Sequence, residues 1–251
     1  MIVESVCISN TGKLRNKNED NVYFNGRWLE QDNSGLKYPM LTKVSTLEDP
    51  IFAVCDGMGG ENAGEVASYI TVSGIDYIRE SYKKKLLGVS DYLKRMTVFL
   101  NEEVFNYSVE NNMGRIGSTL ATMIFRDNYA YVCNVGDSRI FRLRNNSFLQ
   151  MSVDDVENLP QNAKHKPRLT QHIGMDPNEI AIEPHISKSE LKRGDIYLIC
   201  SDGVTDMLTN IEIYNIIKTR ASIKSAVEEI LLKSLENGGR DNISAVICRV
   251  R

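Results

Sequence analysis

Five aspartates stand at the borders of apolar, β-branched segments of this 251-residue chain. Three of them follow such a segment and lie beside a glycine, which permits tight turns and a close approach of the backbone. The other two precede an apolar segment. The five residues are Asp20, Asp56, Asp137, Asp202 and Asp241. The pattern predicts carboxylates at the ends of strands.

Carboxylates at strand ends meet when the strands are antiparallel, because the start of one strand then lies beside the end of its neighbour. Crowded carboxylates repel one another, so a cation or protons must neutralise them. Oxygen ligands without cysteine pairs, in a chain with only three histidines, favour a hard ion such as Mg²⁺ or Mn²⁺. A single Asp-Gly pair usually marks only a turn, but five such acids favour a metal site.

Arg15 lies five residues before Asp20, in a polar segment after the first predicted strand. An isolated arginine in a turn is usually a solvated surface group. Beside a metal and its carboxylates, however, the planar guanidinium offers a fork for two phosphate oxygens. Arg15 is therefore a candidate phosphate-binding residue.

The segments that must position these residues predict an α+β fold, since closely spaced strands alternate with paired helices. No linker divides it, so we expect one domain over 1–251. The polar segment 26–50 is predicted as a loop or hairpin, and 154–166 as a mobile loop. Strands are predicted at 2–9, 22–24, 51–55, 118–125, 129–135, 138–143, 148–151, 180–186, 195–200 and 243–250, and helices from 62, from 93, at 210–219 and at 223–236.

Composition excludes several classes of protein. The formal net charge of −3 argues against a nucleic-acid-binding protein, which usually carries a basic surplus. No apolar run approaches the roughly 20 residues that a membrane span needs, so membrane insertion is not expected. The five cysteines lie in apolar segments without metal-ligand spacing. They favour a reducing compartment, and we expect a cytoplasmic protein.

Six short motifs follow one another from about residue 5 to residue 250. They are Arg15 with Asn18-Glu19-Asp20, Asp56-Gly57-Met58-Gly59-Gly60, Gly117-Ser118-Thr119, Gly136-Asp137-Ser138-Arg139, Ser201-Asp202-Gly203 and Asp241-Asn242. Each motif alone is weak. In this order and spacing they resemble the metal-dependent Ser/Thr protein phosphatases of the type 2C (PPM) family, in the bacterial form.

The resemblance implies a four-layer α/β/β/α sandwich of two antiparallel sheets flanked by helix pairs, with a flap near 154–180. It implies that Arg15 binds the substrate phosphate, that Glu19 acts on the metal through water, and that Asn242 supports Asp241. Two Mn²⁺ or Mg²⁺ ions would be held by Asp20, Asp56, the carbonyl of Gly57, Asp202 and Asp241, and a third ion by Asp137 and Asp202.

The implied activity is hydrolysis of phosphoserine and phosphothreonine in proteins by a hydroxide that bridges two ions, without a phosphoenzyme. Phosphoprotein substrates and an opposing Ser/Thr kinase are the expected partners. The chain departs from relatives at Met58 and Asp155, where histidine is found in some of them, so no general acid is identified. His172 lies in a family motif, but we expect a structural role for it.

Two other functions compete with this hypothesis. A family member that has lost strong catalysis would act as a phosphoprotein-binding regulatory module. Because each expected ligand position keeps its aspartate, the enzyme is favoured. The segment 57–60 also suggests a phosphate-binding loop of a nucleotide-binding protein. That hypothesis is weak, because no Gly-Lys-Ser/Thr follows the glycines and Asp56 would repel a phosphate without a metal.

Overall fold

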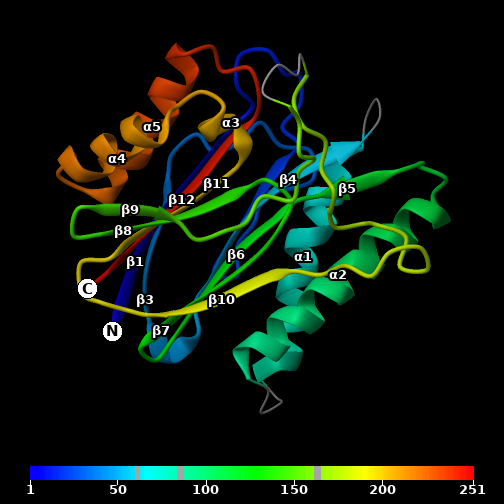
Figure 1. The fold of residues 1–251 in the computed structure, drawn as a ribbon, viewed down its shortest axis with the longest axis horizontal. Coiled ribbons are helices and arrows are strands. Elements are labelled where there is room, and N and C mark those ends of the chain that lie inside the picture. The colour runs from blue at the N-terminus through cyan, green and yellow to red at the C-terminus, as the bar shows by residue number, and fades with distance from the viewer. Residues whose placement is uncertain (60–62, 84–87, 161–164) are drawn as a thin grey trace.

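The computed structural model describes residues 1–59, 63–83, 88–160 and 165–251. Their strands form two antiparallel six-stranded sheets (Figure 1). In spatial order, the first sheet consists of β3 (Met40–Ser45), β1 (Ile2–Asn10), β12 (Ile243–Val250), β11 (Ile196–Cys200), β8 (Arg139–Arg144) and β9 (Ser147–Gln150).

The second sheet lies against the first. Its strands are, in spatial order, β10 (His185–Glu190), β7 (Tyr129–Val135), β6 (Leu120–Arg126), β4 (Ile51–Gly59) and β2 (Asp20–Phe24), with β5 (Ile116–Ser118) paired to the far end of β4. The chain therefore crosses between the two sheets several times, and neighbouring strands are often distant in sequence.

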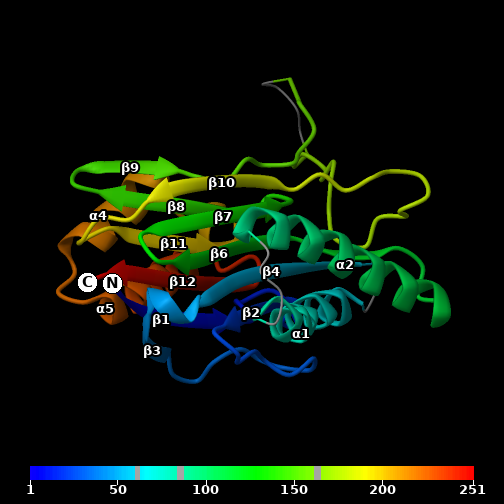
Figure 2. The ribbon, with the colours of Figure 1, turned by 90° about the horizontal axis from the view of Figure 1, so that it is seen from below.

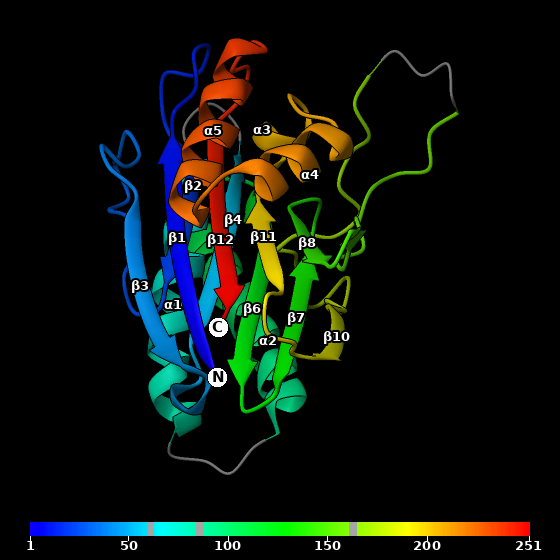
Figure 3. The same ribbon diagram turned by 90° about the vertical axis from the view of Figure 1, so that its left-hand side faces the viewer.

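Helices cover both outer faces, as Figures 2 and 3 show. The second sheet carries α1 (Gly64–Lys83) and α2 (Val89–Glu110), and the first carries α4 (Asn210–Thr219) and α5 (Ile223–Glu236). A short helix, α3 (Asp202–Thr205), follows β11, and a 3-10 turn, η1 (Thr46–Glu48), follows β3. The predicted four-layer sandwich is confirmed.

Three apolar clusters hold the layers together. One lies between α1, α2 and the second sheet, with Ile75 and Met96 fully buried in it. The central cluster joins the two sheets through aromatic side chains such as Phe125 and Tyr197. The third packs α4 and α5 on the first sheet around residues such as Ile213. Each helix pair therefore buries one stripe against a sheet.

The structure corrects three of the predicted elements. The segment 26–50 contains a strand, β3, whose partner is β1 and not another part of the segment. The strand predicted at 180–186 begins only at His185, where pairing with β7 begins. The predicted strand 51–55 continues to Gly59, because β5 supplies a partner for its last three residues. The expected helix start at residue 62 lies outside the described residues.

The ends of α4 and α5 match their predicted bounds because local capping groups define them. Thr209 and Glu212 form a reciprocal capping box before α4, and Ser222 and Ser225 form one before α5. Gly238, with a φ of 131°, follows the end of α5.

Within the ranges that the structure describes, no helix is long and apolar enough to span a bilayer.

Candidate metal centre

The five predicted aspartates come together at one end of the sandwich. Asp20 opens β2 and lies opposite Asp56 of β4 in the strand register. Asp137 follows β7, Asp202 opens α3 directly after β11, and Asp241 precedes β12. The carboxylates of the other four all act electrostatically on that of Asp56. We call these five residues the acid cluster.

Burial and mutual repulsion raise the pKa values in the acid cluster. Burial raises the pKa of Asp20 to about 7, and Asp202 and Asp241 add to this against opposing hydrogen bonds from serines. Burial, followed by the charges of Asp202 and Asp20, raises the pKa of Asp56 well above its usual range. Burial and Asp202 raise the pKa of Asp137 to about 6. The protein groups around the acid cluster therefore do not supply enough positive charge to stabilise its ionised carboxylates.

Two carboxylate oxygens of the cluster fit a cation. Asp20 Oδ1 and Asp202 Oδ1 are buried and have no hydrogen-bond partner among the residues that the structure describes, although buried polar atoms are normally paired. Oxygen donors of this kind suit Mg²⁺ or Mn²⁺. As placed, no three Asp, Glu, His or Cys side chains of the described ranges form a complete chelate. Side-chain cations hold two of the carboxylates instead.

Arg15 supplies one of these cations. Its Nη2 donates to Asp241 Oδ2 at 2.7 Å, and its Nη1 lies 3.9 Å from Glu19 Oε2. The hydrogen bond to Asp241 raises the pKa of Arg15. The side chain is 47% exposed, so the guanidinium stands at the mouth of the acid cluster with access to solvent. This position suits an incoming anion.

Lys166, which the sequence reasoning did not single out, supplies the other cation. Its Nζ contacts Asp202 Oδ2, lies 3.1 Å from Asp206 Oδ2, and is 4.0 Å from Asp137 Oδ2. Burial acts to lower the pKa of Lys166, but Asp202 and Asp206 more than offset it and raise the pKa above its usual value. No local signal predicts this contact, because 36 residues separate Lys166 from Asp202.

Asn242 connects the Arg15 segment to the acid cluster. Its backbone amide donates to Asp241 Oδ1 at 2.9 Å. Its side-chain Oδ1 accepts from the Glu19 amide at 2.8 Å, and its Nδ2 donates to the carbonyls of Thr11 and Lys17 at 2.8 and 2.9 Å. One buried side chain therefore positions the whole turn that carries Arg15 and Glu19 beside Asp241.

Gly57 permits three backbone segments to meet next to Asp56. Its amide donates to the Glu19 carbonyl at 3.1 Å. A Cβ at this position would collide with the carbonyl oxygen of Gly64 at the start of α1 and would lie 2.6 Å from that of Glu19. Glycine is required here because any side chain would separate β4 from α1. Burial raises the pKa of Glu19 in the same corner.

Hydroxyl groups orient the cluster's carboxylates and backbone. Ser201 Oγ donates to Asp20 Oδ2 at 2.7 Å and accepts from the Ser244 amide at 3.1 Å. Thr119 Oγ1 accepts from the Asp56 amide at 2.9 Å and lies 2.7 Å from Ser138 Oγ. Ser201, Thr119 and Ser138 all belong to the motifs quoted from the sequence, but no role was predicted for them.

Asp155 holds the turn before Asp137. It is buried, and its Oδ2 accepts from the Gly136 amide at 2.9 Å. Its Oδ1 lies 2.8 Å from His185 Nε2 and accepts from Gln171 Nε2 at 3.0 Å. Asp155 therefore has a structural role, because it joins the turn before Asp137 to Gln171 and His185. The Nδ1 of His172, in contrast, lies 3.0 Å from the Ile173 carbonyl.

Comparison with known proteins identifies the family. Residues 39–244 match the family described as Protein phosphatase 2C. The chain belongs to the protein phosphatase 2C family. The predicted family and enzyme class, protein serine/threonine phosphatase, are confirmed. The segment 57–59 is part of a strand and not a phosphate-binding loop, and Gly60 lies outside the described residues.

Several bacterial phosphatases are similar to this protein phosphatase 2C member over most of its length. Serine/threonine phosphatase stp of Listeria welshimeri is 27% identical, with 94% of this chain and 91% of that protein covered. PstP of Mycobacterium tuberculosis is also 27% identical over 100% of this chain, which spans 45% of that longer protein. The solved catalytic domain of PstP in complex with two manganese ions has the same fold, with a TM-score of 0.78 at 23% identity over all of both chains.

Proposed function

We propose that this chain hydrolyses phosphoserine and phosphothreonine in proteins with two bound Mn²⁺ or Mg²⁺ ions. The observation that carries the proposal is the acid cluster, in which two buried carboxylate oxygens have no partner within the described ranges and Arg15 pairs with Asp241. In the proposal the two ions are held by Asp20, Asp56, the Gly57 carbonyl, Asp202 and Asp241, and a third ion is held by Asp137 with Asp202.

When bound, the ions activate water for attack on phosphorus and neutralise phosphoryl charge. The chain's own residues supply orientation. Arg15 binds the phosphate oxygens from the solvent side, and Glu19 acts beside it through water. Ser201 and Thr119 fix Asp20 and the backbone of Asp56, so that little reorganisation is needed during the reaction.

The proposal requires no covalent phosphoenzyme. The five cysteines are buried and free. Burial raises the pKa of Cys200 to about 12 and raises that of Cys55 further, so neither is a thiolate nucleophile near neutral pH. Hydrolysis by activated water is the consistent alternative. The free thiols also support a reducing compartment, and we propose the cytoplasm, an opposing Ser/Thr kinase and one phosphatase domain over 1–251 with a flap near 154–180.

Phosphate release from a phosphothreonine peptide tests the proposed function. We expect turnover with Mn²⁺ that disappears with EDTA and returns when Mn²⁺ is restored. Calorimetric titration with Mn²⁺ should show binding that Asp56→Asn weakens, independently of activity. Turnover that resists chelation would contradict the metal assignment. A folded protein that binds Mn²⁺ and phosphopeptide without turnover would instead be the phosphoprotein-binding module.

A further inference from the structure

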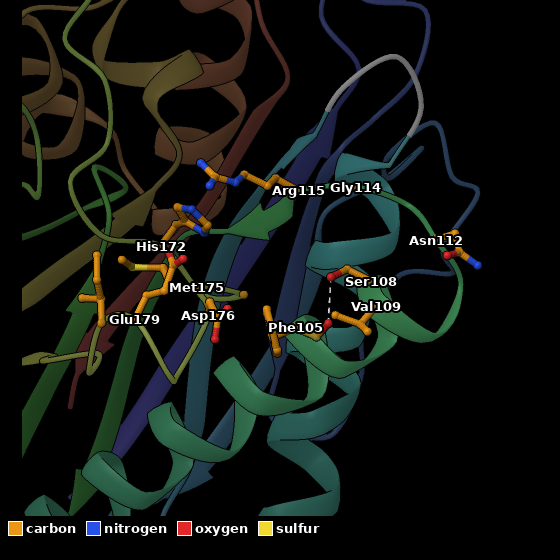
Figure 4. A pocket seen from close by; sticks show the side chains of 12 residues that line it. Phe105, Ser108, Val109, Asn112, Gly114, Arg115, His172, Met175, Asp176 and Glu179 are labelled. Atoms are coloured by element: carbon orange, nitrogen blue, oxygen red, sulfur yellow. Dashed lines mark hydrogen bonds between the residues drawn. The ribbon is translucent and has the colours of Figure 1, made fainter.

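A cavity of about 570 Å³ lies between the end of α2, the start of β5 and the loop at 172–180. In Figure 4 side chains of that loop form one wall and side chains of α2 form the opposite wall, with Arg115 of the β5 approach between them. Its lining includes Phe105, Val109, Arg115, His172, Met175 and Glu179.

The walls of the cavity are held in place by hydrogen bonds. Asn101 of α2 is buried, and its Oδ1 accepts from the amides of Gly174 and Met175, each at 2.9 Å. Its Nδ2 donates to the Met175 carbonyl at 2.9 Å. Ile173 and Ser118 exchange two backbone hydrogen bonds, of 3.0 and 2.8 Å. The loop is thus fixed to both α2 and β5, and a ligand would meet a preformed site.

The strand β5 leads from the cavity toward the acid cluster. Ser118 pairs with Gly57, and Ile116 pairs with Gly59. Arg115 comes directly before β5, three residues from Ser118, and an extended chain advances about 3.3 Å per residue. Arg115 therefore lies on the order of 10 Å along the strand from the acid cluster. An extended peptide with its phosphoresidue at the cluster would reach the cavity about three residues away.

The chemistry of the cavity favours an anionic side chain on that peptide. Arg115 is exposed and forms no ion pair with any residue of the described ranges. The apolar side chains of Phe105, Val109 and Met175 line the same cavity. The lining also holds the carboxylates of Asp176 and Glu179. Neither forms an ion pair with Arg115 within the described ranges, and in Figure 4 both side chains lie on the loop wall, away from the Arg115 guanidinium. An available guanidinium in a cavity that also has apolar side chains suits a glutamate, whose stem is apolar.

We propose that this cavity receives the part of a phosphoprotein substrate that flanks the phosphoresidue, and that Arg115 selects an acidic side chain about three positions from it. The inference rests on the proposed function and specifies its substrates. It makes Arg115 a specificity-determining residue, distinct from the phosphate-binding Arg15.

Paired phosphothreonine peptides test the inference. They carry Glu or Lys three residues from the phosphothreonine, on its N-terminal or its C-terminal side, in otherwise identical sequences. The wild type should favour a Glu peptide over its Lys partner by about tenfold in kcat/KM, and Arg115→Glu should abolish or reverse that ratio. Arg95→Glu, the same charge change on an exposed part of α2 outside the cavity, is the matched control and should keep the ratio.

Binding of the same peptides separates this inference from the proposed function. Fluorescence anisotropy with Asp241→Asn protein reports the preference for Glu over Lys without turnover, and Arg115→Glu in that background should remove it. If the wild type shows no turnover but binding depends on Arg115 in this way, only the proposed function fails. If neither turnover nor binding distinguishes the Glu and Lys peptides, or if Arg115→Glu leaves the ratio unchanged, the inference is wrong.

Discussion

The interior between the two sheets and the acid cluster at the strand ends share one pair of strands. Along paired strands β2 and β4, the register places Phe24 opposite Phe52, Val22 opposite Val54, and Asp20 opposite Asp56. Side chains two apart share a face of a sheet. The same buried face of this strand pair therefore carries aromatic rings at one end and carboxylates a few residues further along.

The two regions differ in what holds them. In the interior, the ring centroid of Phe125 lies 6.1 Å from that of Phe52 and 5.5 Å from that of Tyr197 on the facing sheet. These contacts are favourable without any further group. In the acid cluster, burial and repulsion oppose the ionised state. Stability therefore resides in the interior and chemistry at the strand ends, where a shift of one residue in register would remove Asp20 and Asp56 from the site.

The largest effect should come from the interior. Phe125→Ala removes a fully buried ring between the sheets, and we expect a loss of about 3–5 kcal/mol in the free energy of unfolding. Urea denaturation measures this. Phe148→Ala removes a half-buried ring stacked on Phe141 at the outer strand β9, and should cost clearly less. Equal losses for the two variants would contradict the central role of the inter-sheet cluster.

In the acid cluster, a substitution should lower the activity and leave the stability of the fold intact. Asp241→Asn removes a proposed metal ligand and the partner of Arg15, and phosphate release should fall by about 100-fold or more. Its melting temperature in EDTA should stay the same or rise, because the substitution relieves repulsion on Asp20 and Asp56. Asp127→Asn, in an exposed turn with a φ of 54° that asparagine tolerates, is the control. Unfolding of Asp241→Asn would contradict the division between the two regions.

A smaller effect should follow when the cationic side chain of Lys166 is removed from the acid cluster. Lys166 occupies carboxylates that Mn²⁺ would use, so Lys166→Met should tighten Mn²⁺ binding by roughly fivefold, the value of one modest ion pair. Isothermal titration calorimetry measures the change. Lys218→Met, at an exposed position on α4, should leave Mn²⁺ affinity unaltered. Weaker binding by Lys166→Met would show that the lysine assists the ion.

The smallest effect concerns pH. The pKa of Asp137 is about 6 in the folded protein, above the value of about 3.9 expected in the unfolded chain. A raised folded pKa contributes stability that is complete below the unfolded pKa and is lost as the pH rises through the folded pKa. In EDTA, the melting temperature should therefore fall by a few degrees between pH 5 and 7.5, about the effect of 1 kcal/mol in a domain of this size.

The substitution Asp137→Asn should reduce that fall, because the side chain no longer titrates. Asp20, whose pKa burial raises to about 7, titrates in the same range and should account for the remainder. Saturating Mn²⁺ should reverse the fall, since ionised carboxylates then bind the cation. A wild-type slope that persists in full in Asp137→Asn would assign the effect to other groups.

Local patterns predicted the elements that local forces define. The bounds of β7, α4, α5 and β12 agree with the sequence because periodicity, capping residues and turns specify them. The strand β3 was missed because its side chains are mostly exposed or half-buried, and only pairing with β1 makes it a strand. The apolar segment from residue 180 resembles a strand in sequence, yet Ile180 is 50% exposed and lines the cavity.

The sequence by itself determined the family, the carboxylates and the order in which they occur, because these are properties of residue type and spacing along the chain. Only the tertiary structure decided which side chains meet them. Ser201 lies 181 residues from its partner Asp20, and Lys166 lies 36 residues from Asp202. The cavity at Arg115 exists only because Asn101 and Ser118 fix a distant loop. Contacts over such separations depend on how strands of two sheets pack, which local pattern does not encode.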